Sequence, residues 1–134
     1  MRLILTGIIF LGGMLFTYMG FDFLIRPDGA GAGLGIGALT TTGIAAIRGD
    51  MTAFFLITGL SMLYGSWKRN GDILLIPAFM LGCALFGRTI TFFVNGGEEG
   101  FFIPMMVEAL FCIAALIGSR LLPHPVTDTG TGSD

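Results

Sequence analysis

The sequence has few charged side chains. Only 12% of its 134 residues are charged, whereas 54% are hydrophobic. A soluble domain usually carries about 25% charged residues, and a chain this short leaves about a third of its surface in contact with water. The composition therefore excludes a water-soluble domain, and it also excludes a disordered chain, which would need low hydrophobicity. We expect an integral membrane protein.

Residues that support metal or nucleophilic chemistry are also scarce. His124 is the one histidine and lies between two prolines, and the two cysteines, Cys83 and Cys112, lie inside apolar stretches. This pattern contains neither a metal-site spacing nor a Ser-His-Asp set, so we expect no catalytic residue, no metal, no cofactor and no enzymatic activity. We expect the cysteines to be buried apolar side chains without a disulfide. The net charge of −2 also argues against a nucleic-acid partner.

Four apolar segments can each form a helix that crosses the ~30 Å hydrocarbon core of a bilayer. Short polar turns at residues 68–72 and 95–100 separate the last three, so consecutive helices must be antiparallel neighbours. The sequence thus predicts an all-α membrane protein with four transmembrane helices in an antiparallel bundle. One domain covers residues 1–122, and residues 123–134 form a disordered cytoplasmic tail. The predicted spans are residues 3–24, 51–67, 73–94 and 101–122.

Basic residues at the span ends predict the orientation, because cytoplasmic loops carry an excess of Lys and Arg. The bias predicts that both termini are cytoplasmic. Four basic residues fall on the side of the termini and two on the other: Arg2, Lys68, Arg69 and Arg120 against Arg26 and Arg48.

A glycine-rich segment lies between the first two spans, with glycine at every second position from 29 to 37. It is not a phosphate-binding loop of the P-loop type, because no Lys-Ser/Thr pair follows and no strand precedes it. We expect a loop on the outer face that leads into a short interfacial or re-entrant helix over residues 36–47. The alternatives are close helix packing through the glycines and ligand binding by them.

Two opposite charges lie within the predicted spans, where an isolated charge costs about 2.5–3.5 kcal/mol or more. Arg88 lies six residues before Val94, and Glu108 lies seven residues after Phe101. At ~1.5 Å per residue, both are about 9–10 Å from the outer ends of adjacent antiparallel helices. The sequence therefore predicts that their side-chain tips lie within roughly 8 Å of each other.

Three further charges are expected at the same level, at the outer ends of the first two spans. Asp22 ends the first span, and Asp50 is expected to cap the start of the second helix. Arg48 lies about 200° from Asp50 on a helix, so we place it at the interface or folded back toward Glu108. The predicted structural or ligand-binding cluster is Asp22, Arg48, Asp50, Arg88 and Glu108.

Each span has a stripe of small or polar residues in helical register with its charge, and such stripes are typical of contacts between membrane helices. On the first span the stripe is predicted to follow Gly7, Leu11, Leu15 and Tyr18. On the other spans the predicted helix-packing residues are Ser61, Gly65, Ala84 and Ala115.

Three short motifs resemble a family of small bacterial four-helix membrane proteins, DUF4345. They are Ala46-Ile47-Arg48-Gly49-Asp50, Phe86-Gly87-Arg88-Thr89-Ile90 followed by Asn95-Gly96, and Val107-Glu108-Ala109-Leu110. Asp50 departs from the uncharged residue expected at its position. The resemblance implies a multi-pass protein of the bacterial inner membrane and implies no activity.

The sequence predicts a non-enzymatic membrane component that binds a partner membrane protein or a small or lipidic ligand near the charged cluster. One alternative is a proton- or ion-coupled small transporter that works as an oligomer. Another is an accessory subunit of a membrane redox complex, although the chain offers no haem or metal ligands with which to carry electrons itself. The expected partners are the lipid bilayer and either a partner membrane protein or further copies of this chain.

Overall fold

The computed structural model describes residues 2–124, and this part of the chain is helical without a β-strand. Four helices are long and apolar enough to cross a membrane, which confirms the predicted all-α architecture. Short helices and a π-helical turn lie between the first and second of them. In chain order the elements are α1 (Arg2–Ile25), α2 (Pro27–Ala32), α3 (Thr41–Ala46), η1 (the π-helical turn Ile47–Met51), α4 (Thr52–Trp67), α5 (Leu75–Asn95) and α6 (Phe102–Leu121).

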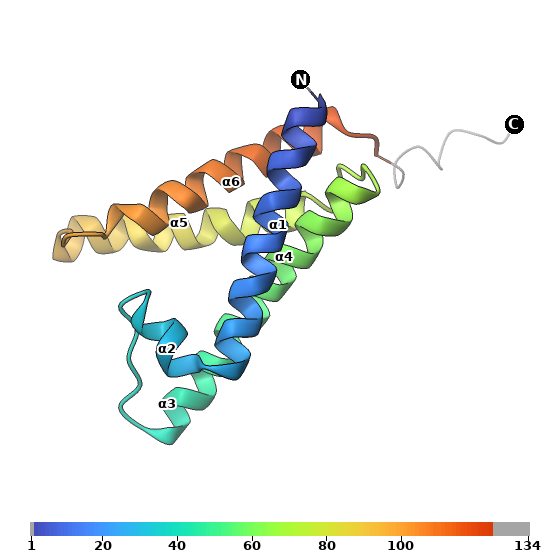
Figure 1. The fold of residues 1–134 in the computed structure, drawn as a ribbon. Helices are drawn as coiled ribbons and strands as arrows, with labels where there is room; N and C mark the ends of the chain where they lie inside the picture. The colour runs from blue at the N-terminus through green and yellow to red at the C-terminus, as the bar shows by residue number, and fades with distance from the viewer. Residues whose placement is uncertain (1, 125–134) are drawn as a thin grey trace, which may run out of the picture.

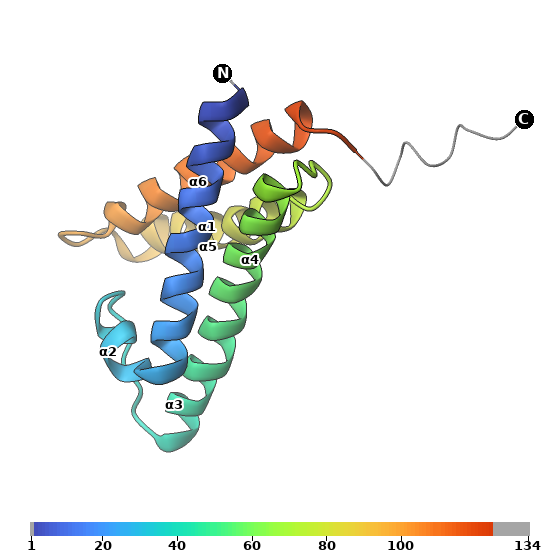
Figure 2. The same ribbon diagram turned by 45° about the vertical axis from the view of Figure 1, so that its right-hand side comes forward.

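The four long helices form two antiparallel hairpins (Figure 1). One hairpin pairs α1 with α4 along their lengths, and the other pairs α5 with α6. The hairpins meet near the amino terminus and the turn between α4 and α5, and they diverge toward their other ends, as both views show (Figures 1 and 2). The bundle is therefore closed at the end where the chain begins and splayed at the opposite end.

Glycines bring α1 and α4 into close contact. A Cβ atom placed on Gly59 would lie 2.4 Å from the backbone nitrogen of Thr17, and one on Gly13 would lie 2.9 Å from the backbone nitrogen of Leu63. Only glycine allows two helix backbones to approach this closely. The α1–α4 hairpin is therefore held by backbone proximity as well as by side-chain packing.

The face of α1 that packs on its neighbours is not the predicted one. The stripe through Gly7, Leu11, Leu15 and Tyr18 is exposed. The reason is that α1 is apolar on all sides, so Asp22 does not mark its contact face, whereas the glycines allow close approach. The buried residues are Ile9, Gly12, Gly13, Phe16, Gly20 and Phe23.

Phenylalanines fill the core between the hairpins. Phe16 and Phe23 of α1 both stack on Phe55 of α4, with ring centroids 6.1 and 5.4 Å apart. Phe111 of α6 packs against Phe16 in a T-shaped arrangement, with ring centroids 5.5 Å apart. Aromatic pairs in these geometries stabilise a core beyond their buried area, so this cluster joins α6 to the α1–α4 hairpin.

The second span begins ten residues earlier than predicted, because α3, η1 and α4 form one continuous helix over Thr41–Trp67. Thr40 caps this helix: its Oγ1 accepts a hydrogen bond from the backbone nitrogen of Gly43 at 3.1 Å. The prediction that Asp50 caps the helix is therefore wrong, since Asp50 lies inside the π-helical turn. The separate helix predicted over 36–47 is also wrong, because its second half belongs to the long helix.

The glycine-rich segment begins as a helix and continues as a loop. Pro27 opens α2 at its first turn, where the absent N–H costs no hydrogen bond. The loop over 33–40 then leads to the cap at Thr40. A loop is thus present, but the short helix precedes it instead of following it.

The residues after α6 pack on the turn between α4 and α5. Gly71 donates its backbone N–H to the carbonyl oxygen of Pro123 at 2.9 Å, and Nδ1 of His124 lies 2.7 Å from Oδ1 of Asp72. Pro123 and His124, assigned to the tail from sequence, therefore contact the bundle. The rest of the predicted disordered tail, residues 125–134, lies outside the described residues.

Candidate functional site at Arg88 and Glu108

The two charges predicted to meet within the membrane form an ion pair between α5 and α6. Nε of Arg88 lies 3.0 Å from both Oε1 and Oε2 of Glu108. The Glu108 side chain is 8% exposed and the Arg88 side chain 28%. The predicted proximity is confirmed, and antiparallel packing of adjacent helices is what brings the two residues to the same depth.

The pair leaves most of the hydrogen-bonding capacity of Arg88 unused. A guanidinium has five N–H donors in a planar fork, and the contacts to Glu108 use only the Nε donor. Within residues 2–124, no hydrogen bond is formed by the terminal nitrogens of Arg88. Glu108 therefore holds and neutralises the guanidinium while its outer N–H groups stay open to a ligand.

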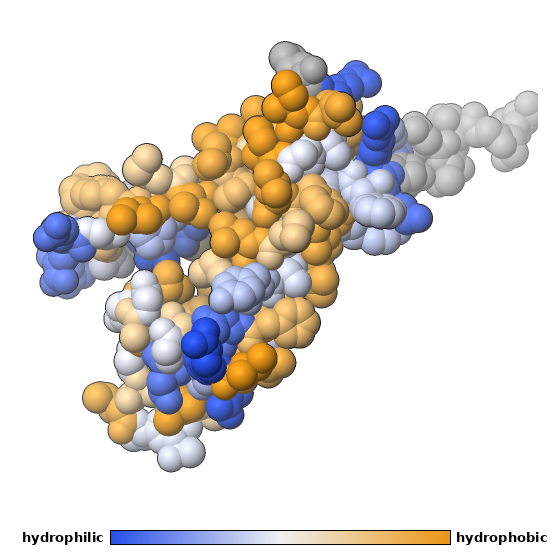
Figure 3. Space-filling model, viewed as in Figure 1, coloured by the Kyte–Doolittle hydropathy of each residue, from blue (hydrophilic) through white to orange (hydrophobic). Residues whose placement is uncertain are grey.

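Arg88 lines a groove of about 510 Å³ at the splayed end of the hairpins. One wall comes from α5, the turn after it and the start of α6, and the other comes from the loop residues 33–35. Figure 3 shows the molecule hollowed between the α5–α6 arm and the α2 segment, with hydrophilic residues at the tip of the arm. The groove therefore joins the buried ion pair to the splayed end of the bundle.

A polar strip on α5 runs from the ion pair to the rim of the groove. Arg88, Thr91 and Asn95 all line the groove, and their spacing of three and four residues puts them on one helix face. The Thr91 hydroxyl donates to the carbonyl oxygen of Gly87 at 3.0 Å, so its oxygen still has accepting capacity. Glu98 and Glu99 complete the strip in the turn beyond α5.

The structure does not gather the other three predicted charges around this pair. Asp22 forms an ion pair with Arg26 one helical turn away, with Nε 3.0 Å from Oδ1. This hydrogen bond and the charge of Asp22 raise the pKa of the Arg26 guanidinium above its ordinary value. Arg48 and Asp50 are exposed on the π-helical turn, and neither forms an ion pair within the described part of the chain. The divergence of the hairpins separates these charges from the α5–α6 arm.

The predicted helix-packing residues divide into two groups. Ala115 and Gly65 are buried, and a Cβ atom on Gly65 would lie 2.5 Å from a side-chain carbon of Leu74. Ser61 and Ala84 are half-buried. Sequence reasoning missed the contact glycines of α1 and α4, although Gly13 and Gly20, seven residues apart on one helix face, were a readable signal for the contact face of α1.

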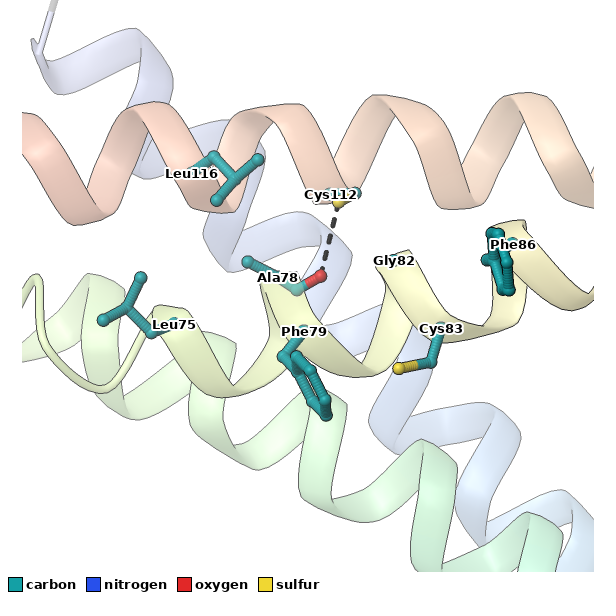
Figure 4. A pocket seen from close by; sticks show the side chains of 8 residues that line it. All are labelled: Leu75, Ala78, Phe79, Gly82, Cys83, Phe86, Cys112 and Leu116. Atoms are coloured by element: carbon teal, nitrogen blue, oxygen red, sulfur yellow. Dashed lines mark hydrogen bonds between the residues drawn. The ribbon is translucent and has the colours of Figure 1, made fainter.

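A second groove of about 570 Å³ lies on the α5–α6 arm and is lined by apolar residues and the two thiols (Figure 4). Cys112 donates its S–H to the carbonyl oxygen of Ala78 at 3.3 Å. Both cysteines are free, as expected, but Cys83 is exposed and not buried as predicted. This groove lacks charged groups and is typical of a surface in contact with lipid tails.

The structure assigns this protein to a broad class and not to a family. Comparison of the chain with protein-family models, curated proteins and solved structures finds no match. Within residues 2–124, no group of three His, Cys, Asp or Glu side chains could hold a metal ion. The four apolar helices make this a multi-pass helical membrane protein. The resemblance to DUF4345 stays a prediction.

Proposed function

We propose that this protein is a non-enzymatic component of a bacterial inner membrane that binds a small or lipidic ligand through an anionic group at Arg88. The observation that carries the proposal is a guanidinium fixed by Glu108 beside a groove of about 510 Å³; within residues 2–124 its terminal nitrogens have no hydrogen-bond partner. A preoriented guanidinium fork suits carboxylate or phosphate oxygens, which it can bind through two parallel hydrogen bonds.

The position of the groove favours binding over transport. All of its lining residues belong to the splayed end of the bundle, and the turn between α4 and α5 contributes none of them. A proton- or ion-coupled transporter would need a path that reaches both ends of the helices.

The proposal predicts that the anionic ligand depends on Arg88. Wild-type protein, purified in a mild detergent and exposed to a total bacterial phospholipid extract, is expected to retain phosphate-bearing molecules in native mass spectrometry. The double variant Arg88→Gln/Glu108→Gln keeps a neutral hydrogen-bonding pair and is expected to lose at least about 90% of this retention, which corresponds to ~1.4 kcal/mol or more.

Arg48→Gln is the matched control, since it removes an exposed arginine outside the groove. It should retain the same molecules as the wild type. Equal retention by the Arg88→Gln/Glu108→Gln variant would contradict the proposal.

We also propose that the turn carrying Glu98 and Glu99 faces the periplasm and that both termini are cytoplasmic. The support is the concentration of Lys68, Arg69 and Arg120 at the other end of the helices. In a cysteine-free background, Glu99→Cys is expected to react with a membrane-impermeant maleimide on intact spheroplasts. Lys68→Cys should react only after permeabilisation. The reverse pattern would overturn this orientation.

A further inference from the structure

The groove carries opposite charges at its base and its rim. We propose that its ligand is a phospholipid whose headgroup combines a phosphate with a primary ammonium, the phosphatidylethanolamine class. The phosphate would bind Arg88 at the base, and the ammonium would bind Glu98 and Glu99 at the rim. This inference rests on the proposed function and names the ligand class of the same site.

The base of the groove suits a phosphate that is drawn below the ends of the helices. Arg88 lies seven residues before the end of α5, a depth of about 10 Å. Thr91 and Asn95 provide polar atoms between Arg88 and the end of α5, so a headgroup can form hydrogen bonds along the length of the groove. A phosphodiester has two free oxygens, which match the two terminal nitrogens of the guanidinium.

The rim of the groove selects for a cation with N–H donors. Glu98 and Glu99 are exposed, and within residues 2–124 neither carboxylate forms an ion pair. A primary ammonium can donate hydrogen bonds to both carboxylates, whereas a quaternary ammonium has no N–H group to donate. The rim therefore favours ethanolamine over choline.

The charge balance of the groove disfavours a ligand that is only anionic. Glu108 already neutralises Arg88, so the two rim carboxylates leave the site with a net negative charge. A lone phosphate or a phosphatidylglycerol headgroup adds a further negative charge with no cation to compensate the rim. A zwitterion satisfies Arg88 and the rim together.

The surroundings of the groove favour a lipid over a soluble zwitterion. Leu34, Phe101 and Ile103 contribute apolar surface to the lining. Below the groove, the outer face of α6 exposes Ile103, Met106 and Leu110, which are spaced at helical intervals. Acyl chains attached to a headgroup in the groove can lie along this apolar face.

The experiment compares dihexanoyl phosphatidylethanolamine, phosphatidylcholine and phosphatidylglycerol, together with free phosphoethanolamine, as probes of the full-length protein in detergent. Titration followed by native mass spectrometry is expected to show that phosphatidylethanolamine binds at least about tenfold more tightly than the other three, as expected for charge-assisted hydrogen bonds. The variant Glu98→Gln/Glu99→Gln should lose this preference over phosphatidylglycerol. Asp28→Asn, which removes an exposed carboxylate outside the groove, should preserve it.

The outcomes separate this inference from the proposed function. An unchanged preference in Glu98→Gln/Glu99→Gln, with binding still lost in Arg88→Gln/Glu108→Gln, overturns the headgroup assignment and leaves anion binding at Arg88 in place. Free phosphoethanolamine that binds as tightly as the lipid overturns the assignment to a lipid. If both double variants bind all four probes as tightly as the wild type does, the proposed function is overturned as well.

Discussion

Arg88→Met is expected to destabilise the folded protein by about 3–5 kcal/mol, the usual cost of leaving a buried charge without its partner. The Glu108 side chain is 8% exposed, and within the described residues its side-chain hydrogen bonds both come from Nε of Arg88. Methionine fills much of the same volume but offers no N–H donor. The loss should be measured as the free energy of unfolding in mixed detergent micelles titrated with sodium dodecyl sulfate.

The matched control removes both charges at once. Arg88→Met/Glu108→Met leaves no unpaired ion and should recover most of the lost stability, because replacing a buried ion pair by apolar residues is often close to neutral. Asp22→Asn breaks the exposed pair with Arg26 and should leave the unfolding midpoint almost unchanged. If Arg88→Met unfolds at the wild-type midpoint, the pair does not stabilise the bundle.

Gly59→Ala is expected to separate α1 from α4 and to destabilise the protein by about 1–3 kcal/mol, as overpacking of a tight contact does. The added methyl group would lie 2.4 Å from the backbone nitrogen of Thr17, and a backbone atom cannot move aside as a flexible side chain can. The same unfolding titration measures the effect. Cross-linking between cysteines introduced on the two helices reports the separation independently.

Gly7→Ala is the control for Gly59→Ala on the same hairpin. A Cβ atom on Gly7 would meet no other atom within 4 Å, so alanine adds no clash there. Alanine restricts the unfolded chain and favours helix, which should stabilise the protein by up to about 1 kcal/mol. The two substitutions are therefore expected to act with opposite signs. A gain of stability in both would mean that helix propensity, and not the close contact, governs the result.

Sequence reasoning succeeded where the membrane imposes a strong constraint. The hydrocarbon thickness fixes the length of a span, so the predicted first, third and fourth helices end within two residues of α1, α5 and α6. An ionised group in lipid requires a partner, so the depths of Arg88 and Glu108 on adjacent antiparallel helices were enough to predict their contact. Both predictions depend on position along single helices and not on how the helices pack.

Sequence reasoning failed where several arrangements satisfy the membrane equally well. Lipid is as apolar as a helix interface, so hydropathy cannot tell which side of α1 contacts α4. The start of the second span depended on the cap at Thr40 and on tolerance of Gly43 and Gly49 inside a helix. Asp22 pairs with Arg26 one helical turn away, and a prediction based on depth alone does not reveal this pair.

The sequence by itself thus determined that the chain is a four-helix membrane protein with one ion pair between its last two spans. Only the tertiary structure decided that the hairpins diverge, that the loop over 33–35 faces α5 and α6, and that Arg88 shares a groove with Glu98 and Glu99. A charge inside the membrane needs a partner, and its position along a helix can be read directly from the sequence. The angle between two hairpins depends on how glycine contacts and phenylalanine rings fit together, and that fit exists only in the folded protein.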